Sequence, residues 1–424
     1  MCSNIEVLAI SFNGYDKLID KIAKELSDGK IKPSTLNSEL VQKIYADLES
    51  GAKDGYGKKW EKFPKDGKGS TPRELKKNLF AFSGAKTYAQ LVAINDLLVD
   101  KDGKLRPYNE FEQLARGINR QYNKNYLQAE YQTARTAAQM AEKWERLQET
   151  KDLFPNLKYR TAGDSRVRPE HEKLDGIIKP LDDPFWSTYY PPLDFRCRCD
   201  VVATAEDATE YKEKDLPPVQ FKGNVGKDKE IFRKNGSFFK LAATNKDATR
   251  NIELTKLNAP YEQAYKSAKG KKVEVNIYAD EKDLESNVET AIVITDSLNL
   301  NVQVRPHIDT NKAKGLKNPE YFINGNVADL KSDFKANNYK SINNAFKAAR
   351  EQGLESIVFD FTTSFKQIDP VQINRWVLSN INDKRGKQFK EVIFVYNRKA
   401  IIVKRENIVN KQLLPELEKL KAGS

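Results

Sequence analysis

The stretch from Asn318 to Ser332 holds the residues best suited to catalysis. In the sequence NPEYFINGNVADLKS, Glu320 precedes one expected strand, and Asp329 and Lys331 lie two positions apart on the next, so their side chains share one face. Two carboxylates on neighbouring strands can bind a hard divalent cation, and a lysine beside them can orient water and neutralise phosphate charge. This pattern predicts metal-assisted phosphodiester cleavage, with Glu320 and Asp329 as ligands of Mg²⁺ or Mn²⁺.

A second group of reactive residues lies between positions 161 and 202. It contains one of the two histidines and two of the three cysteines: His171, Cys197 and Cys199. These residue types bind zinc, with Asp164 or Asp175 as a fourth ligand, so a structural Zn²⁺ site is one interpretation. Because Cys-X-Cys is tighter than the usual C-X2-C turn, we favour the simpler interpretation of buried thiols in a packed loop. Arginine–aspartate pairs would hold that loop closed.

Length and charge bound the whole chain. With 424 residues it exceeds what one hydrophobic core usually organises, so two or three domains are expected. The net charge of +12 favours a polyanionic partner, and nucleic acid is the natural candidate. Three cysteines form no disulfide framework, and the sequence has neither a leader pattern nor an apolar run that could span a bilayer. We therefore expect synthesis in the cytoplasm and no membrane partner.

Apolar periodicity predicts a mainly α-helical first half. Helices are expected within residues 16–48, over 87–99 and over 108–147. Residues 51–72, rich in Gly and Lys, are predicted to form an exposed loop. We assign residues 1–205 to a helical domain that includes the irregular Cys/Arg-rich segment. Residues 206–255 are assigned to a linker with a short ordered island.

The pattern changes after residue 255 and predicts an α/β domain over 256–410, followed by a tail over 411–424. Strands are expected at 273–277, from 302, at 321–330 as a hairpin around Asn324-Gly325, and at 357–361, 392–396 and 400–403. Helices are expected at 283–298, 341–352 and 371–380. The predicted fold class is thus multidomain, helical first and α/β second.

Seven short blocks between residues 162 and 199 carry a family resemblance. They are Ala162-Gly163-Asp164, Arg166-Val167-Arg168-Pro169, His171, Leu174-Asp175-Gly176, Asp183-Pro184-Phe185-Trp186, Pro191-Pro192 and Arg196-Cys197-Arg198-Cys199. Their order and spacing resemble the phage Mu F-like family of minor head proteins. The resemblance implies a virion component that joins portal and capsid during head assembly, and it implies no reaction.

The second half resembles the PD-(D/E)XK nucleases, which have the restriction-endonuclease-like fold. Glu320 stands at the first acid, where Asp is commoner, and Asp329-Leu330-Lys331 matches the second acid, spacer and lysine. Residues 341–352 look like the core helix of the toxin nucleases that end contact-dependent inhibition proteins. The resemblance implies Glu285 as an additional helix acid. It also implies a catalytic role for Gln352, and substrate-binding roles for Lys340 and Asn344.

His307 lies close to the acid–lysine group in sequence. It could bind phosphate or shuttle a proton, and a hydrogen-bonded structural histidine is the alternative.

Together these features predict a phage or prophage head protein that carries a nuclease effector, which acts on DNA or RNA in the bacterial cytoplasm. Its expected partners are portal or capsid proteins, nucleic acid and an immunity protein. One alternative is a purely structural minor capsid protein whose C-terminal domain binds DNA or capsid without catalysis. Another is a metal-independent RNase, against which the single histidine of the second half argues.

Overall fold

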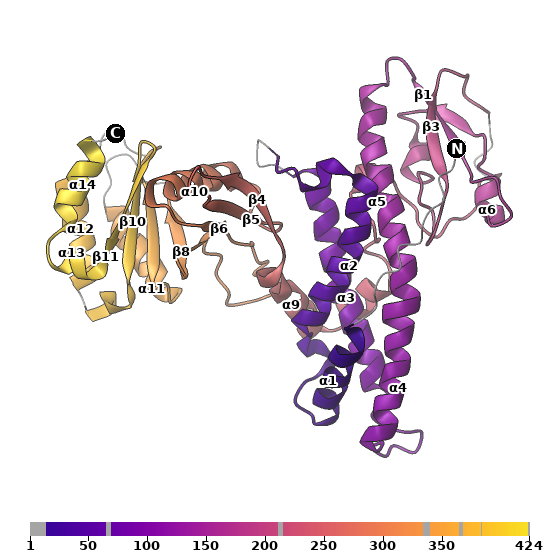
Figure 1. Cartoon of the computed structure of the whole chain (residues 1–424), viewed down its shortest axis with the longest axis horizontal. Helices are drawn as coiled ribbons and strands as arrows, with labels where there is room; N and C mark the ends of the chain where they lie inside the picture. Colours follow the sequence, from indigo (N-terminus) through magenta and orange to yellow (C-terminus); the bar gives the residue numbers. More distant parts are fainter. Residues whose placement is uncertain are drawn as a thin grey trace. The chain divides into compact units, whose positions relative to one another are not determined.

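The computed structural model describes residues 14–64, 69–210, 215–332, 334, 340–363, 368–382 and 384–422. The chain divides into two compact units (Figure 1). Unit 1 comprises Met1–Lys62 and Ser70–Thr255, and unit 2 comprises Phe63–Gly69 and Lys256–Ser424.

Unit 1 is mainly helical, which confirms the predicted class of the first half. Its long helices are α1 (Tyr15–Ser27), α2 (Ser38–Tyr56), α3 (Thr71–Asn95), α4 (Tyr108–Arg120) and α5 (Leu127–Glu149). A π-helical turn over Gln121–Tyr126 joins α4 to α5, so the predicted long helix is present. Shorter helices are α6 (Pro169–Glu172), α7 (Val225–Asp228), α8 (Ser237–Ala243) and α9 (Lys246–Thr255).

In the segment predicted as a Gly/Lys loop, 51–72, residues 51–56, 58–61 and 71–72 are helical, so the prediction was wrong there; residues 65–68 lie outside the described residues. Gly51 and Gly55 lie within α2, which packs beside α5 (Figure 1). A Cβ atom at Gly55 would lie 1.9 Å from the carbonyl oxygen of Arg135, so only glycine allows this approach. Helix α3 begins at Thr71 rather than near residue 87, with the Ser70 hydroxyl accepting a hydrogen bond from the Arg73 amide.

The segment predicted as a linker, 206–255, contributes α7, α8 and α9 to unit 1. The Asn78 side chain on α3 exchanges two hydrogen bonds with the backbone of Phe232, at 2.9 and 2.8 Å. The Phe232 ring stacks on that of Phe82, with 3.8 Å between the centroids. This segment has few apolar residues among many polar ones. The sequence therefore shows only weak helical periodicity here, and the helices were not predicted.

A small antiparallel sheet, in the order β2-β1-β3, frames the irregular Cys/Arg-rich segment. Its strands are β1 (Asn156–Arg160), β2 (Ile178–Pro180) and β3 (Asp200–Thr204). Leu157 and Tyr159 on β1 are fully buried. The sheet brings the chain before residue 161 and the chain after residue 199 together.

A buried ion pair joins α3 and α5. Lys86 and Glu130 are almost fully buried, with exposed side-chain fractions of 0% and 3%, and their charged groups are hydrogen bonded to each other. Burial lowers the pKa of Lys86 and raises the pKa of Glu130, while the pairing opposes both shifts.

We expect Glu130→Ala to lower the free energy of unfolding of unit 1 by about 3–5 kcal/mol, because it leaves Lys86 buried without a counter-charge. Chemical denaturation followed by tryptophan fluorescence measures the change. Lys86→Met combined with Glu130→Leu should recover most of the loss, and Glu61→Ala at the exposed pair with Lys53 is the control. An equal loss in the single and double variants would contradict this explanation.

Unit 2 is an α/β unit with a mixed sheet, and the sequence of the second half predicts an α/β domain. Its strands are β4 (Tyr261–Lys266), β5 (Lys272–Asn276), β6 (Val302–Val304), β7 (Tyr321–Ile323), β8 (Asn326–Lys331), β9 (Ser356–Asp360), β10 (Glu391–Tyr396) and β11 (Lys399–Lys404). Its helices are α10 (Leu284–Leu298), α11 (Lys340–Glu351), α12 (Pro370–Asn382), α13 (Arg405–Val409) and α14 (Leu413–Ala422).

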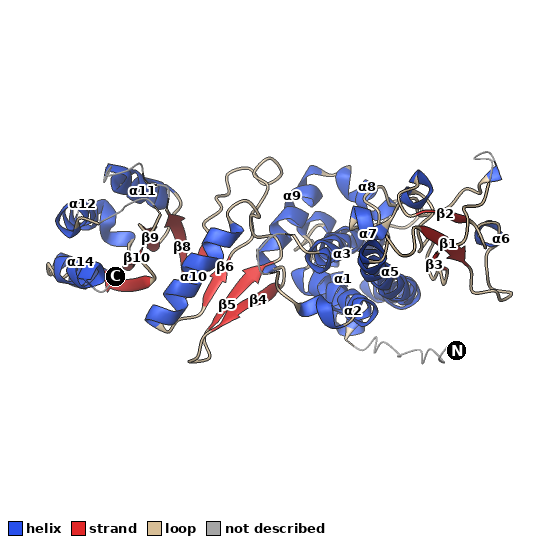
Figure 2. Cartoon of the chain, turned by 90° about the horizontal axis from the view of Figure 1, so that it is seen from above, coloured by secondary structure: helices blue, strands red, loops and turns tan. Residues whose placement is uncertain are grey.

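The sheet runs in the order β11-β10-β9-β8-β7-β6-β5-β4 and is covered on both faces (Figure 2). Helix α10 packs on one face with Val358 and Val395. Helices α11, α12 and α14 pack on the other face with Ile357 and Phe359. Strands β6, β7 and β8 are antiparallel, and α11 crosses from β8 to the parallel strand β9. Residues of the expected tail therefore belong to the core, through Leu413, Leu417 and Leu420.

The tight turn between β7 and β8 lies where the sequence predicts it. Asn324 and Gly325 both have positive φ, 50° and 82°, as a type I′ hairpin turn requires. This turn sets the register in which Tyr321 lies opposite Ala328. In the part of the chain that the structure describes, no helix has the length and apolar character needed to cross a bilayer.

Candidate functional site

The β7–β8 hairpin brings the predicted acids and lysine together in unit 2. Because Tyr321 pairs with Ala328, the next positions along the two strands, Glu320 and Asp329, also lie opposite each other. Glu320 Oε2 accepts a hydrogen bond from the Leu330 amide at 2.7 Å. Lys331 Nζ lies 2.6 Å from Asp329 Oδ2, and the Asp329 side chain is only 4% exposed. Two carboxyl groups and an ammonium therefore converge on one patch.

The Glu320 carboxyl holds its proton more tightly than an exposed acid does. Burial, a hydrogen bond to Asp329 and the charge of Asp329 together raise the pKa of Glu320 to about 8, against the opposing effects of the Leu330 amide and Lys331. A divalent cation bound between these carboxylates would take the place of that proton. The arrangement thus fits a hard cation through oxygen ligands, and Lys331 lies beside it.

A cavity of about 210 Å³ adjoins Glu320. It is lined by Asp280, Asp283, Asn287, Val304, Arg305, Pro306, His307, Asn318, Pro319 and Glu320. The His307 Nδ1 atom lies 3.4 Å from Asp280 Oδ2, and the Arg305 guanidinium donates to the Pro319 carbonyl at 3.0 Å. The structure therefore brings His307 and Glu320 to one cavity, which the Arg305 side chain also lines.

Other predicted residues of this site lie elsewhere. Glu285 is exposed and does not line the cavity; Asp283 and Asn287, which flank it on the same turn of α10, do. Gln352 follows the C-terminal end of α11. Because β8 and β9 are parallel, α11 runs back from the C-terminal end of β8 to the N-terminal end of β9. Its own C-terminal end therefore lies at the opposite end of the strands from Lys331. A direct catalytic role for Gln352 does not fit this placement.

Lys340 and Asn344 are exposed on the N-terminal part of α11, the helix that follows β8. That part lies at the same end of the strands as Lys331, since α11 crosses from the end of β8 to the start of the parallel strand β9. The sequence pattern missed Asp283, Asn287 and Arg305. The only signal that could have found them is the four-residue spacing on α10 and the position of Arg305 directly after β6.

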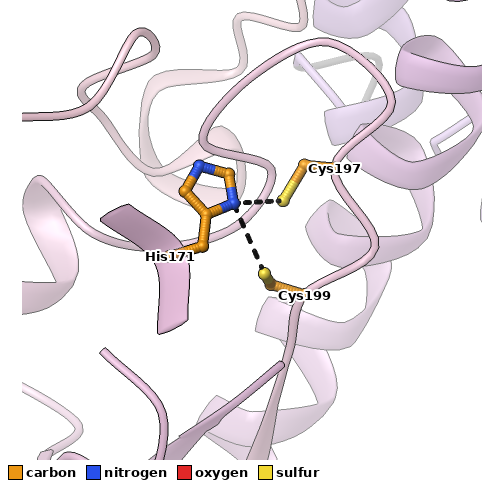
Figure 3. Close-up of side chains that lie close together, drawn as sticks. All are labelled: His171, Cys197 and Cys199. Carbon is orange, nitrogen blue, oxygen red and sulfur yellow. Dashed lines mark hydrogen bonds between the residues drawn. The ribbon is translucent and has the colours of Figure 1, made fainter. Parts of the chain in front are cut away.

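In unit 1, the single histidine and two of the cysteines also converge (Figure 3). His171 Nδ1 lies 3.7 Å from Cys197 Sγ and 3.6 Å from Cys199 Sγ, and all three residues are buried. His171 lies on the short helix α6, which starts at Pro169, and the two cysteines immediately precede β3. Their ligand atoms all lie within 4.8 Å of one another.

The pKa values of the two thiols are shifted in opposite directions. The hydrogen bond with Cys199 lowers the pKa of Cys197 to about 4; burial opposes this shift and the bond with His171 adds to it. The same hydrogen bond and burial raise the pKa of Cys199.

Arginine–aspartate pairs enclose this cluster, as the sequence predicts, and Asp164 is one of the predicted partners. Arg198 makes a bidentate pair with Asp164 at 2.7 and 2.6 Å, which holds the pKa of Asp164 well below its usual range. Arg168 pairs with Asp194 at 3.1 Å, a contact the sequence did not indicate. Asp175 instead accepts hydrogen bonds from the backbone and hydroxyl of Thr161.

The shifted pKa of Glu320 predicts a pH-dependent stability of unit 2 without divalent metal. Between the ordinary value of 4.5 and about 8, the folded chain holds a proton that the unfolded chain has released. Stability is therefore greatest below the lower value and falls as pH rises through the upper one. Calorimetric melting in EDTA across this range should show the fall, and Glu320→Gln should flatten it. Glu285→Gln is the exposed control, and an unchanged slope in Glu320→Gln would contradict the assignment.

Comparison with known proteins defines the class of part of unit 1. Residues 68–202 match the family described as phage Mu protein F like protein. This region is therefore a phage Mu F-like domain, and it contains His171, Cys197 and Cys199. The family match ends before unit 2 continues at residue 256, so it does not include Glu320, Asp329 or Lys331.

Two relatives cover short parts of the chain. Protein F of Escherichia phage Mu, which is named as a capsid assembly protein, is 32% identical over 119 residues, or 27% of this chain and 26% of that protein. The Mu-like prophage FluMu F protein of Haemophilus influenzae is 42% identical over 82 residues, or 19% of this chain and 18% of that protein. The chain thus spans about a quarter or less of each relative. No solved structure matches the chain.

Proposed function

We propose that the chain is a minor head protein of a phage or prophage, and that unit 2 is a metal-dependent nuclease carried with the head. The head-assembly part rests on the Mu F-like domain over residues 68–202 and on the capsid assembly name of its phage Mu relative. By this proposal its partners are portal or capsid proteins, and the protein is associated with the virion.

Incorporation into heads tests the first part. Co-expression with the portal and major capsid proteins of the same phage should place the chain in particles purified on a gradient. Deleting residues 68–202 should abolish incorporation, whereas Asp329→Asn in unit 2 should leave it unchanged. Incorporation of the deletion variant at the wild-type level would contradict a role for this domain.

The nuclease part rests on one observation: Glu320, Asp329 and Lys331 converge on neighbouring strands. The arrangement around them supports the resemblance to PD-(D/E)XK nucleases, because the acids lie on a β-hairpin and the next helix crosses to a parallel strand. In this mechanism Glu320 and Asp329 hold Mg²⁺ or Mn²⁺, and Lys331 orients the attacking water. The metal supplies Lewis-acid activation of the phosphate when bound.

The cavity beside Glu320 suits an anionic substrate. Arg305 and His307 line it, and His307 Nδ1 lies 3.4 Å from Asp280 Oδ2. By this proposal the two side chains contact phosphate on the substrate strand. The net charge of +12 supports association with nucleic acid. A nuclease made in the host cytoplasm also requires an inhibitor there, so we include an immunity protein among the proposed partners.

Incubation of the full chain with plasmid DNA and with total tRNA, in Mg²⁺ or Mn²⁺, tests the second part and names the substrate. Lys331→Ala and Asp329→Asn should each reduce the cleavage rate by roughly 10²-fold or more, because each removes a group that acts on the reacting atoms. Glu285→Gln, a substitution on the exposed face of α10, is the matched control.

The alternatives give different results in the same assay. Cleavage that survives EDTA would indicate a metal-independent RNase. If the folded chain leaves both substrates intact, the nuclease proposal fails and a structural role, in which unit 2 only binds DNA or capsid, takes its place.

A further inference from the structure

The cluster of His171, Cys197 and Cys199 has the geometry of a tetrahedral metal site. With Zn–S near 2.3 Å and Zn–N near 2.0–2.1 Å, the nitrogen–sulfur edge of a tetrahedron is roughly 3.5–3.6 Å. The observed separations from His171 Nδ1 are 3.6 and 3.7 Å. We propose that His171 Nδ1, Cys197 Sγ and Cys199 Sγ bind a structural Zn²⁺ ion.

Hydrogen bonding does not account for both contacts of the His171 ring nitrogen. One ring nitrogen of His171 faces two sulfur atoms at once (Figure 3), and a neutral imidazole nitrogen either donates one hydrogen or accepts one. The remaining contact is then left without a hydrogen, although all three residues are buried. A cation between the three atoms satisfies each of them. This geometry reverses the preference for plain buried thiols that the Cys-X-Cys spacing suggests.

The ligand types select the metal. Thiolate is a soft ligand that suits zinc far better than Mg²⁺ or Ca²⁺, and a tetrahedral site of sulfur and nitrogen is typical of zinc. The sequence-predicted fourth ligands do not complete the site. Asp164 is paired with Arg198, and Asp175 accepts from Thr161. Among the residues that the structure describes, no other His, Cys, Asp or Glu joins the cluster.

A small pocket beside the cluster leaves room for the fourth ligand. It has a volume of about 20 Å³, enough for one water molecule, and Arg166, Arg168, Arg196 and Arg198 are among the residues that line it. A water molecule bound there would complete the tetrahedron, facing guanidinium groups. The proposed site is thus Cys2His plus one water.

The ion would fix the irregular segment. It would join helix α6 to the residues just before β3 across 26 to 28 positions of chain. In a reducing cytoplasm, where a disulfide would not persist, zinc provides such a cross-link. This inference is independent of the proposed nuclease, because the two sites lie in different units and use different ligand chemistry.

Metal content tests the inference directly. The full chain is purified in reducing buffer without a chelator, and any histidine tag is removed. Elemental analysis by inductively coupled plasma mass spectrometry should then find about one zinc ion per chain. Replacement of zinc by Co²⁺ should give visible bands of tetrahedral cobalt and a thiolate charge-transfer band. An oxygen-ligated metal in unit 2 would give no such band. Zinc removal should lower the melting temperature of unit 1 by several degrees.

Variants assign the ligands. Cys197→Ser, Cys199→Ser and His171→Ala should each lose zinc, and Cys2→Ser, the remaining cysteine of the sequence, should keep it. The cobalt spectrum of the wild-type chain does not depend on whether the variants fold. Folded wild-type chain that holds no zinc and gives no thiolate–cobalt band would overturn the proposal, as would zinc retained in both cysteine variants.

Discussion

Buried polar and ionisable groups need partners, and this constraint shapes both units. Lys86 and Glu130 are tolerated between α3 and α5 because each is the other's counter-charge. In unit 2, Asp329 is buried where Lys331 and Glu320 can reach it. Glu130 and Glu320 come from elements next to the group they partner, whereas Lys331 lies on the same strand as Asp329, so both packing and strand alternation set the electrostatics of these groups.

The same constraint separates structure from candidate chemistry. The pair between Lys86 and Glu130 is closed, since the two charged groups are almost fully buried and hydrogen bonded to each other. Glu320, in contrast, has a raised pKa because it is buried beside Asp329, and it lines an open cavity. A cation bound between the two acids would offset the burial and the negative charge that raise this pKa. That difference, rather than the presence of charge, makes the hairpin a candidate site.

Local patterns could be predicted from the sequence, and tertiary contacts could not. The Asn324-Gly325 turn and the acids on either side of it lie within a dozen residues, so turn chemistry and strand alternation were sufficient. Gly51 and Gly55 were misread as loop residues because their reason, the close approach of α5, lies some eighty positions away. Glu285, which the nuclease resemblance implied, is exposed and does not line the cavity that Asp283 and Asn287 line; helix phase cannot be set to one residue from sequence.

For the cysteine cluster too, the residue types could be predicted from the sequence but the distances between them could not. Its residue types were visible in the sequence, but whether a nitrogen and two sulfurs lie at metal-ligand separations depends on how β1 pairs with β3 and where α6 packs. The spacing of Cys197 and Cys199 alone favoured packed thiols, since it describes only one edge of the cluster. His171 supplies the other edges from 26 positions away, and it is their length that makes a tetrahedral zinc site the better account of this buried group.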